Sequence, residues 1–345
     1  MKRILSILVL VVFCAVASAQ DKELMSQYQQ QLRELFANVM SAPTDNERYN
    51  ANELAVQTFS DALNVPNSFK WEWDLGRYVS VLTSPDGKIR VITWPVVSDY
   101  GEYECFGFMQ VYDEKVKDYV VYCLQDKSDE LFNLEESLFT TDHWLGVVYQ
   151  QLIQTKYEDR TFYTLLGWTG VNNLVQRKVI EPVCFRGSSS RPIFGQALFR
   201  RQTNNRRIVL DYSRNAMVNL NYSEQYTREV ERKRVKSGKG KNARMMTIKE
   251  NHDKIEPMII FDEIGPQIPG MEGLFQYYVP TGVEKAYIFV NGRWELNDNA
   301  QGRVPNERLN QDFNAPKPKT APAYQFIPRS DVPAKPESPT LSEEE

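Results

Sequence analysis

Residues 78–97 read Tyr-Val-Ser-Val-Leu-Thr-Ser-Pro-Asp-Gly-Lys-Ile-Arg-Val-Ile-Thr-Trp-Pro-Val-Val. Two runs rich in β-branched and aromatic residues flank the tetrapeptide Ser84-Pro85-Asp86-Gly87. Proline suits the second position of a tight turn, and glycine suits a position with positive φ. The stretch therefore predicts a β-hairpin with strands at 78–83 and 88–97.

The same alternation continues to residue 296 and predicts about fourteen strands in all. The others are expected at 103–112, 118–125, 145–156, 161–168, 175–185, 192–200, 206–212, 217–222, 258–261, 274–279, 287–290 and 293–296. Nearly all are joined by short turns, which indicates antiparallel pairing. So many strands must split into packed layers, close on themselves or break into blades. We expect a mainly β fold over residues 67–298, either an antiparallel multi-strand sandwich or a curved multi-sheet domain, with a β-propeller-like fold as the alternative.

An antiparallel αα-hairpin is expected before this β domain, within residues 20–66. Apolar residues recur at helical spacing over 24–40 and again over 54–63. Thr44, with Glu47 three residues later, forms a capping box for the second helix. Two short helices cannot bury an apolar stripe alone, so we expect the pair to dock on the β domain.

Residues 1–19 have the pattern of a secretion signal. Lys2 and Arg3 precede the apolar run 4–16, and Ala17-Ser18-Ala19 supplies the small residues that a signal peptidase recognises. The run is shorter than the roughly 20 residues needed to span a bilayer. We predict cleavage after Ala19 and an exported protein of the periplasm or outer envelope, without a transmembrane segment.

The composition of the 345 residues is that of a folded protein, with 42% hydrophobic, 12% aromatic and 25% charged residues. Only 2 histidines are present, which disfavours His-based catalysis and zinc binding. Neither Asp142-His143 nor His252 is accompanied by a Gly-x-Ser-x-Gly motif or by metal-ligand spacing. We therefore expect no catalytic residue, no metal and no cofactor.

Three cysteines remain after the predicted cleavage, at positions 105, 123 and 184. A cross-strand bridge between Cys105 and Cys123 is one interpretation, and a pairing with Cys184 stays open. Both depend on strand register, because a slip of one residue puts two side chains on opposite faces. Three buried free thiols is the interpretation we favour.

Charge is distributed unevenly along the chain. Residues 200–249 carry 14 Lys and Arg against 4 Asp and Glu, a net charge of +10, so the rest of the chain carries −14. We interpret residues 224–254 as a solvated basic insertion between two strands, either without function or able to bind an acidic partner by charge attraction. Its candidate binding residues are Arg228, Arg232, Lys233, Arg234, Lys236, Lys239, Lys241 and Arg244.

The C-terminal residues 299–345 have a different composition. They hold 8 of the 18 prolines and end in three glutamates, Glu343 to Glu345. Such a segment cannot form a core, and we predict a disordered tail.

Paired carboxylates leave one catalytic alternative open. Asp126, Asp129 and Glu130, or Asp262 and Glu263, have the chemistry of a general acid and base or of Ca²⁺ ligands. The favoured interpretation is that all five are solvated turn residues.

Five stretches of the chain resemble a family of exported proteins of Bacteroidetes to which no activity is assigned. They are Leu-Thr-Ser-Pro-Asp-Gly-Lys-Ile-Arg-Val-Ile-Thr-Trp at 82–94, Phe-Gly-Phe at 106–108, Tyr-Thr-Leu-Leu-Gly-Trp at 163–168, Phe-Gly-Gln-Ala-Leu-Phe at 194–199 and Val-Asn-Gly-Arg-Trp at 290–294. The resemblance implies a Gram-negative envelope setting and favours the periplasm. It implies no site residue.

Two functions are therefore expected. The first is a non-catalytic binding protein of the cell envelope whose partner is another envelope protein, an acidic glycan or a lipid. Nucleic acid is not expected, because of the export signal and because no aromatic residue stands among the clustered cations. The alternative is a carbohydrate- or peptidoglycan-active hydrolase that uses paired carboxylates.

Overall fold

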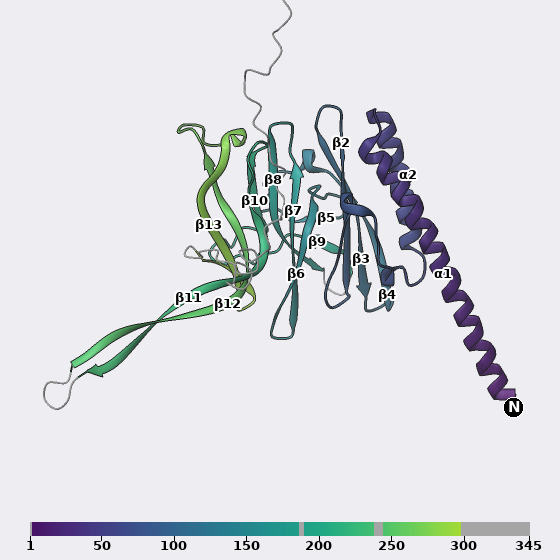
Figure 1. Cartoon of the computed structure of the whole chain (residues 1–345), viewed down its shortest axis with the longest axis horizontal. Helices are drawn as coiled ribbons and strands as arrows, with labels where there is room; N and C mark the ends of the chain where they lie inside the picture. Colours follow the sequence, from purple (N-terminus) through teal and green to yellow (C-terminus); the bar gives the residue numbers. More distant parts are fainter. Residues whose placement is uncertain (1, 186–189, 238–243, 298–345) are drawn as a thin grey trace, which may run out of the picture. The chain divides into compact units, whose positions relative to one another are not determined.

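The computed structural model describes residues 2–185, 190–237 and 244–297, which form two N-terminal helices and three antiparallel sheets (Figure 1). The mainly β fold with a helical hairpin in front of it is confirmed. The three sheets have four, six and four strands with unlike strand orders, so the described part of the chain does not form the repeated blades of a propeller. The tail predicted at 299–345 lies outside the described residues.

The helices α1 (Lys2–Ser41) and α2 (Asp45–Leu63) form the predicted hairpin. Thr44 caps α2 as expected, because its Oγ1 accepts the backbone N–H of Glu47 at 3.4 Å. Within the described helices, no segment is both long and apolar enough to cross a bilayer. Residues 2–19 are part of α1, and their removal as a secretion signal stays a prediction.

Fourteen strands make up the three sheets in the described residues. The first sheet has the order β1 (Ser80–Thr83), β2 (Ile89–Val97), β3 (Tyr103–Asp113), β4 (Asp118–Gln125). The second has the order β5 (Phe139–Thr140), β9 (Pro192–Phe194), β8 (Val175–Phe185), β7 (Arg160–Gly170), β6 (Val148–Tyr157), and β10 (Ile208–Ser213) also pairs with β8. The third has the order β11 (Leu220–Ser237), β12 (Arg244–Pro266), β13 (Tyr278–Val290), β14 (Arg293–Asn297).

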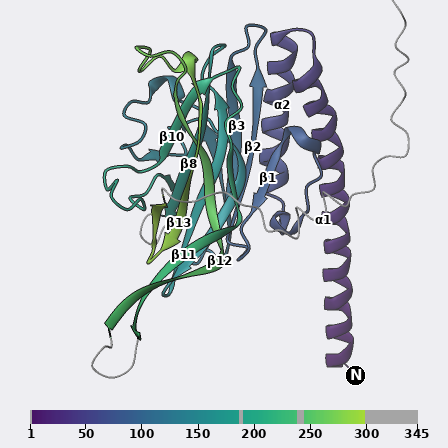
Figure 2. The ribbon, with the colours of Figure 1, turned by 60° about the vertical axis from the view of Figure 1, so that its left-hand side comes forward.

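Strand β2 shows how the layers stack, because both of its faces are buried. Ile89 and Val91 belong to the core between the first and second sheets, whereas Ile92 and Trp94 belong to the core beneath the helices. The Trp94 Nε1–H donates to the Asn52 side-chain oxygen at 2.7 Å and so fixes α2 on this sheet. Figure 2 shows both helices lying along the first sheet.

The second sheet is likewise covered on both faces. Its residues Val179 and Leu165 face the first sheet, and Ile180 and Leu166 face the third. The described chain is therefore a stack of four layers, with the helices outermost, then the first, second and third sheets.

A fully buried ion pair lies in the second sheet. The Arg207 Nε–H donates to the Glu181 carboxylate at 2.6 Å, and both side chains are 0% exposed. The remaining Arg207 N–H groups donate to the backbone carbonyls of Leu134, Ser137 and Phe194. Tyr149 donates its hydroxyl hydrogen to the other Glu181 oxygen. Every charged atom of the pair thus has a partner, which is the condition for burying charge.

Two strand predictions are corrected by turn geometry. The strand expected at 192–200 ends at Phe194, because Gly195 has a φ of 95°. The strand expected at 274–279 begins as the 3₁₀ turn Phe275–Tyr277 and becomes β13 only at Tyr278. The short strand β5 was not predicted.

The cysteine interpretation is also corrected. All three cysteines are free, but only Cys105 is buried; Cys123 is exposed and Cys184 is partly exposed. Cys123 pairs in register with Phe108, and position 105 lies three residues away on the same strand. An odd separation puts Cys105 and Cys123 on opposite faces of the sheet, so the cross-strand bridge does not form.

The basic insertion is not a loop. Residues expected as a solvated connection between two strands instead extend both of them, and β11 and β12 pair without a register shift from Leu220↔Phe261 to Ser237↔Arg244. The sequence did not indicate these extensions, because the charged segment has too few apolar residues to show the alternation that is typical of a strand. Lys239 and Lys241 lie outside the described residues.

We predict that Arg207→Met lowers the free energy of unfolding by about 3–5 kcal/mol, because it leaves the Glu181 charge buried without a partner. Urea denaturation measures this loss. The matched control is Lys88→Met in the exposed Lys88–Glu114 pair, where the side chains are 52% and 73% exposed, and it should change stability by about 1 kcal/mol or less. Equal effects of the two substitutions would contradict a structural role for the buried pair.

Candidate functional site

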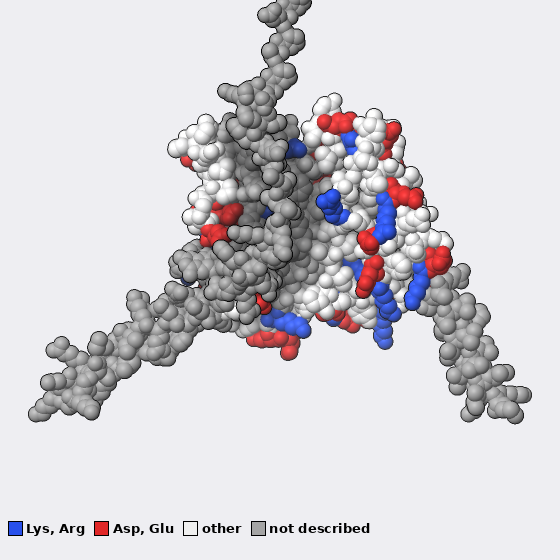
Figure 3. Space-filling view, in the orientation of Figure 1, with Lys and Arg blue, Asp and Glu red and all other residues white. Residues whose placement is uncertain are grey.

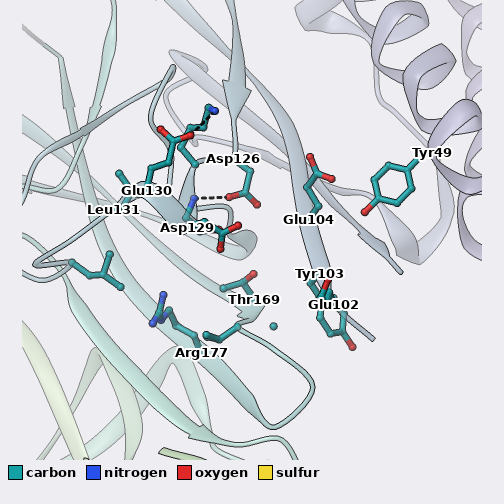
Figure 4. A pocket seen from close by; sticks show the side chains of 15 residues that line it. Tyr49, Glu102, Tyr103, Glu104, Asp126, Asp129, Glu130, Leu131, Thr169 and Arg177 are labelled. Carbon is teal, nitrogen blue, oxygen red and sulfur yellow. Dashed lines mark hydrogen bonds and ion pairs between the residues drawn. The ribbon is translucent and has the colours of Figure 1, made fainter. Parts of the chain in front are cut away.

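A cavity of about 510 Å³ lies beside β3, β8 and the segment that follows β4 (Figure 4). Its wall is rich in carboxylates and also includes two tyrosines. The lining residues that the site depends on are Tyr49, Glu102, Tyr103, Glu104, Asp126, Asp129, Glu130 and Arg177. Helix α2 contributes Tyr49, so the helical hairpin completes the site.

Asp126 is a fixed part of the wall. Its two carboxylate oxygens accept the backbone N–H groups of Cys105 at 2.9 Å and of Ser128 at 3.0 Å. Gly146 makes room for this carboxylate, because a Cβ there would lie 2.1 Å from an Asp126 oxygen. With both oxygens bound to backbone, Asp126 positions the chain rather than facing a ligand.

Glu104 is held in a less favourable environment. Glu104 is an exposed residue, but partial desolvation of its carboxyl group raises its pKa, and the nearby Asp126 and Asp129 carboxylates raise it further. A hydrogen bond from the Tyr49 hydroxyl acts in the opposite direction. Figure 4 shows the Tyr49 and Glu104 side chains pointing toward one another. Burial also raises the pKa of Tyr49, to about 12, so the phenol stays protonated and donates.

The two cations of the wall are already engaged. The Lys127 ammonium pairs with Glu130 at 2.8 Å, and the Arg177 guanidinium pairs with both oxygens of Asp211, at 2.6 and 2.8 Å. Among the described residues, no Lys or Arg pairs with Glu102, Glu104 or Asp129. The cavity is therefore a concentration of negative charge.

The structure brings one of the two predicted carboxylate groups together. Asp126, Asp129 and Glu130 line the cavity. Asp262 and Glu263 do not; they lie within β12 and not in a turn, and Glu263 pairs with Lys285 at 2.6 Å. In the part of the chain that the structure describes, no group of three or more His, Cys, Asp or Glu residues is arranged to hold a metal ion.

Sequence reasoning missed Glu104, Tyr49 and Arg177. Glu102 and Glu104 alternate with Tyr103 and Cys105 at the start of β3, and two acids there were the available signal. Nothing local in the sequence links them to Tyr49, which lies on α2. Among the His-based candidates, the Asp142 carboxylate pairs with Arg191 at 2.6 Å.

Six of the eight predicted basic site residues lie on the β11–β12 ribbon, the paired segment Thr227–Ser237 with Arg244–Lys254, and Lys239 and Lys241 lie outside the described residues. Paired residues are Arg228↔Asp253, Arg232↔Lys249, Lys233↔Ile248, Arg234↔Thr247, Lys236↔Met245 and Ser237↔Arg244. Residues directly opposite one another in an antiparallel pair share a face, and neighbours along a strand alternate. The register therefore divides these cations between two faces of the ribbon.

Comparison of the chain with models of protein families, with curated proteins and with solved structures gave no match. The resemblance to exported proteins of Bacteroidetes stays a prediction.

We predict that Glu104→Gln stabilises the protein at pH 7. A pKa that is raised in the folded state means that stability from this group falls as pH rises through the window above the ordinary value of 4.5. The amide removes that penalty and still accepts the Tyr49 hydrogen bond. Thermal unfolding at pH 4 and pH 7 tests this.

The variant should melt above the parent at pH 7, and the difference should shrink toward pH 4. The control is Glu72→Gln, an exposed glutamate outside the cavity, which should shift neither curve. A Glu104→Gln protein that melts below the parent at pH 7 would rule out the electrostatic cost assigned to the cavity.

Proposed function

We propose that this chain is an exported, envelope-associated, non-catalytic binding protein that engages an acidic partner through the β11–β12 ribbon. One observation carries the proposal: the most basic part of the sequence is a paired, regular ribbon. From Pro257 to Arg244, β12 pairs in register with β11, while its pairing with β13 begins only at Met258. Figure 1 shows the two strands running on together beyond β13.

Physical chemistry favours a partner for such a ribbon. A two-stranded ribbon without a third strand is marginally stable by itself. Lysine and arginine on a strand edge also prevent unwanted pairing with strands of other molecules. The positive charge of the ribbon therefore has two explanations, partner binding and protection of the strand edges. A measurement of binding distinguishes these two explanations.

The described body of the molecule differs from the ribbon in its charge pattern. On the face seen in Figure 3, Lys and Arg are interspersed with Asp and Glu over the helices and the first sheet. Such a mixed surface does not attract a partner of one sign, whereas the ribbon holds eight Lys and Arg against four Asp and Glu, a net charge of +4. An acidic partner is therefore drawn to the ribbon.

We predict that changing Arg232, Lys233, Arg234 and Lys236 together to serine abolishes capture of acidic envelope components. The melting temperature should stay within about 2 °C of the parent, because surface substitutions away from a core cost little. Crosslinking pull-down from the native envelope, at low and high salt, measures the capture. Capture that is unchanged in the variant, or that does not weaken with salt, would refute the proposal.

A hydrolase is the second candidate, and Glu104 is the observation that favours it. A carboxyl group with a raised pKa that shares one cavity with other carboxyl groups has the chemistry of a general acid with its partner. Against it, Asp126 uses both oxygens on backbone N–H groups, which leaves Asp129 and Glu102 as the carboxylates of the wall without a Lys or Arg partner among the described residues.

Incubation with purified peptidoglycan, followed by measurement of released reducing ends, decides between the candidates. A non-catalytic protein releases none above buffer. Release by the parent that is lost in both Glu104→Gln and Asp129→Asn would establish the hydrolase instead. The serine variant of the ribbon is the control, since it leaves the cavity intact.

A further inference from the structure

We propose that the ribbon binds a linear polyanion along one of its two faces: a chain that carries carboxylate or phosphate groups at regular intervals, such as an acidic glycan. This rests on the proposed function and narrows it to one class of partner and one face. The argument uses the backbone register of β11 and β12.

The register separates the charges sharply. Five cations and one acid share the first face: Arg228, Arg232, Arg234, Lys236, Lys249 and Asp253. Three cations and three acids share the second: Lys233, Arg244, Lys254, Glu229, Glu231 and Glu250. The first face thus carries a net charge of +4 and the second a net charge of zero, although both belong to the same basic segment. We call them the basic face and the neutral face.

The cations of the basic face form a row. Residues two apart on a strand lie about 6.8 Å from one another, so Arg228 to Lys236 extends over about 27 Å. The row holds Lys249 directly opposite Arg232, and its other four cations follow one another along β11. It matches a ligand whose own charges are arranged in a line.

The twist of the ribbon favours a flexible chain as the ligand, in preference to a flat surface. Two-stranded ribbons twist more strongly than the strands of larger sheets, and Figure 1 shows β11 and β12 winding about each other. A planar bilayer meets only part of a row of charges that rotates along its length. A flexible polymer follows the rotation and meets all of it.

The sequence also indicates that charge is what the ribbon recognises. No Phe, Tyr or Trp occurs from Thr227 to Lys254, so bases or sugar rings find no aromatic platform there. Recognition through a row of Arg and Lys depends on the spacing of anionic groups and on salt.

Two triple variants with the same change in charge test which face binds. Arg232→Ser, Arg234→Ser and Lys236→Ser together remove three cations from the basic face. Lys233→Ser, Arg244→Ser and Lys254→Ser together remove three from the neutral face. Circular dichroism and melting temperature establish that both variants keep the fold of the parent.

The probes are fluorescent polyglutamate chains of 2, 4, 8 and 16 residues, measured by anisotropy. With 3.3–3.6 Å per extended residue, about 8 residues match the 27 Å row. Affinity of the parent should rise steeply up to the 8-residue chain and then flatten.

For a single-stranded polyanion, each contact contributes about −0.7 to the slope of log affinity against log salt. Five contacts therefore predict that raising the salt concentration from 50 to 200 mM weakens binding by the parent about 100-fold. The basic-face variant, with two contacts left, should lose only about 7-fold over the same range and should bind more weakly throughout. The neutral-face variant should match the parent.

The other outcomes each decide something different. Equal weakening by both triple variants overturns the one-face assignment while leaving an acidic partner in place. Competition by inorganic phosphate at the concentration of the 8-residue chain, or binding to phosphatidylglycerol vesicles but not to the chains, overturns the linear ligand. No effect of either variant on capture from the envelope overturns the proposed function itself.

Discussion

The buried Glu181–Arg207 pair is the interaction on which the architecture depends, because it lies in the middle of the stack, where the sheet has protein on both sides. Both side chains of the pair are fully buried, so their charges need fixed partners. Arg207 has such partners, because it also donates to the carbonyls of Leu134 and Ser137, which precede β5, and to that of Phe194 at the end of β9. The pair therefore orders the chain between the first and second sheets. Leu134 also lines the acidic cavity, so the same pair shapes the wall of the cavity.

Packing of the third sheet against the second determines which residues of the ribbon share a face. Ile259 and Phe261 of β12 pack into the core shared with the second sheet, together with Tyr287 of β13. These contacts fix which residues of β12 face inward, and the alternation of a strand then assigns every residue beyond them. The division of the distal cations between two faces is thus set by apolar packing at the base of the ribbon.

Local turn chemistry made much of the fold predictable. The strands expected at 118–125 and 175–185 have the observed bounds, and the Asn291-Gly292 turn joins β13 to β14 with both residues at positive φ. Prediction failed where long-range contacts decide. The extension of β11 and β12 through a charged segment has too few apolar residues to show a period of two, and it follows from pairing with the partner strand.

The acidic cavity also depends on contacts between residues that are far apart in the sequence. Asp126, Asp129 and Glu130 stand together in the sequence and were recognised as a carboxylate group. Glu104 and Tyr49 reach them only because the first sheet pairs β3 with β4 and because α2 packs on that sheet. No spacing within the chain encodes that meeting.

The register of the ribbon is the central claim, and cysteine crosslinking tests it most directly. In a background with the native cysteines changed to serine, Glu231→Cys with Glu250→Cys places two thiols at directly opposed positions, where Cα atoms lie about 4.5–5.5 Å apart and a disulfide can form. Glu231→Cys with Asn251→Cys is offset by one residue and puts them on opposite faces. We expect rapid oxidation of the opposed pair and little of the offset pair. The reverse result would show that the strands are shifted and that the cations of the basic face do not share a face.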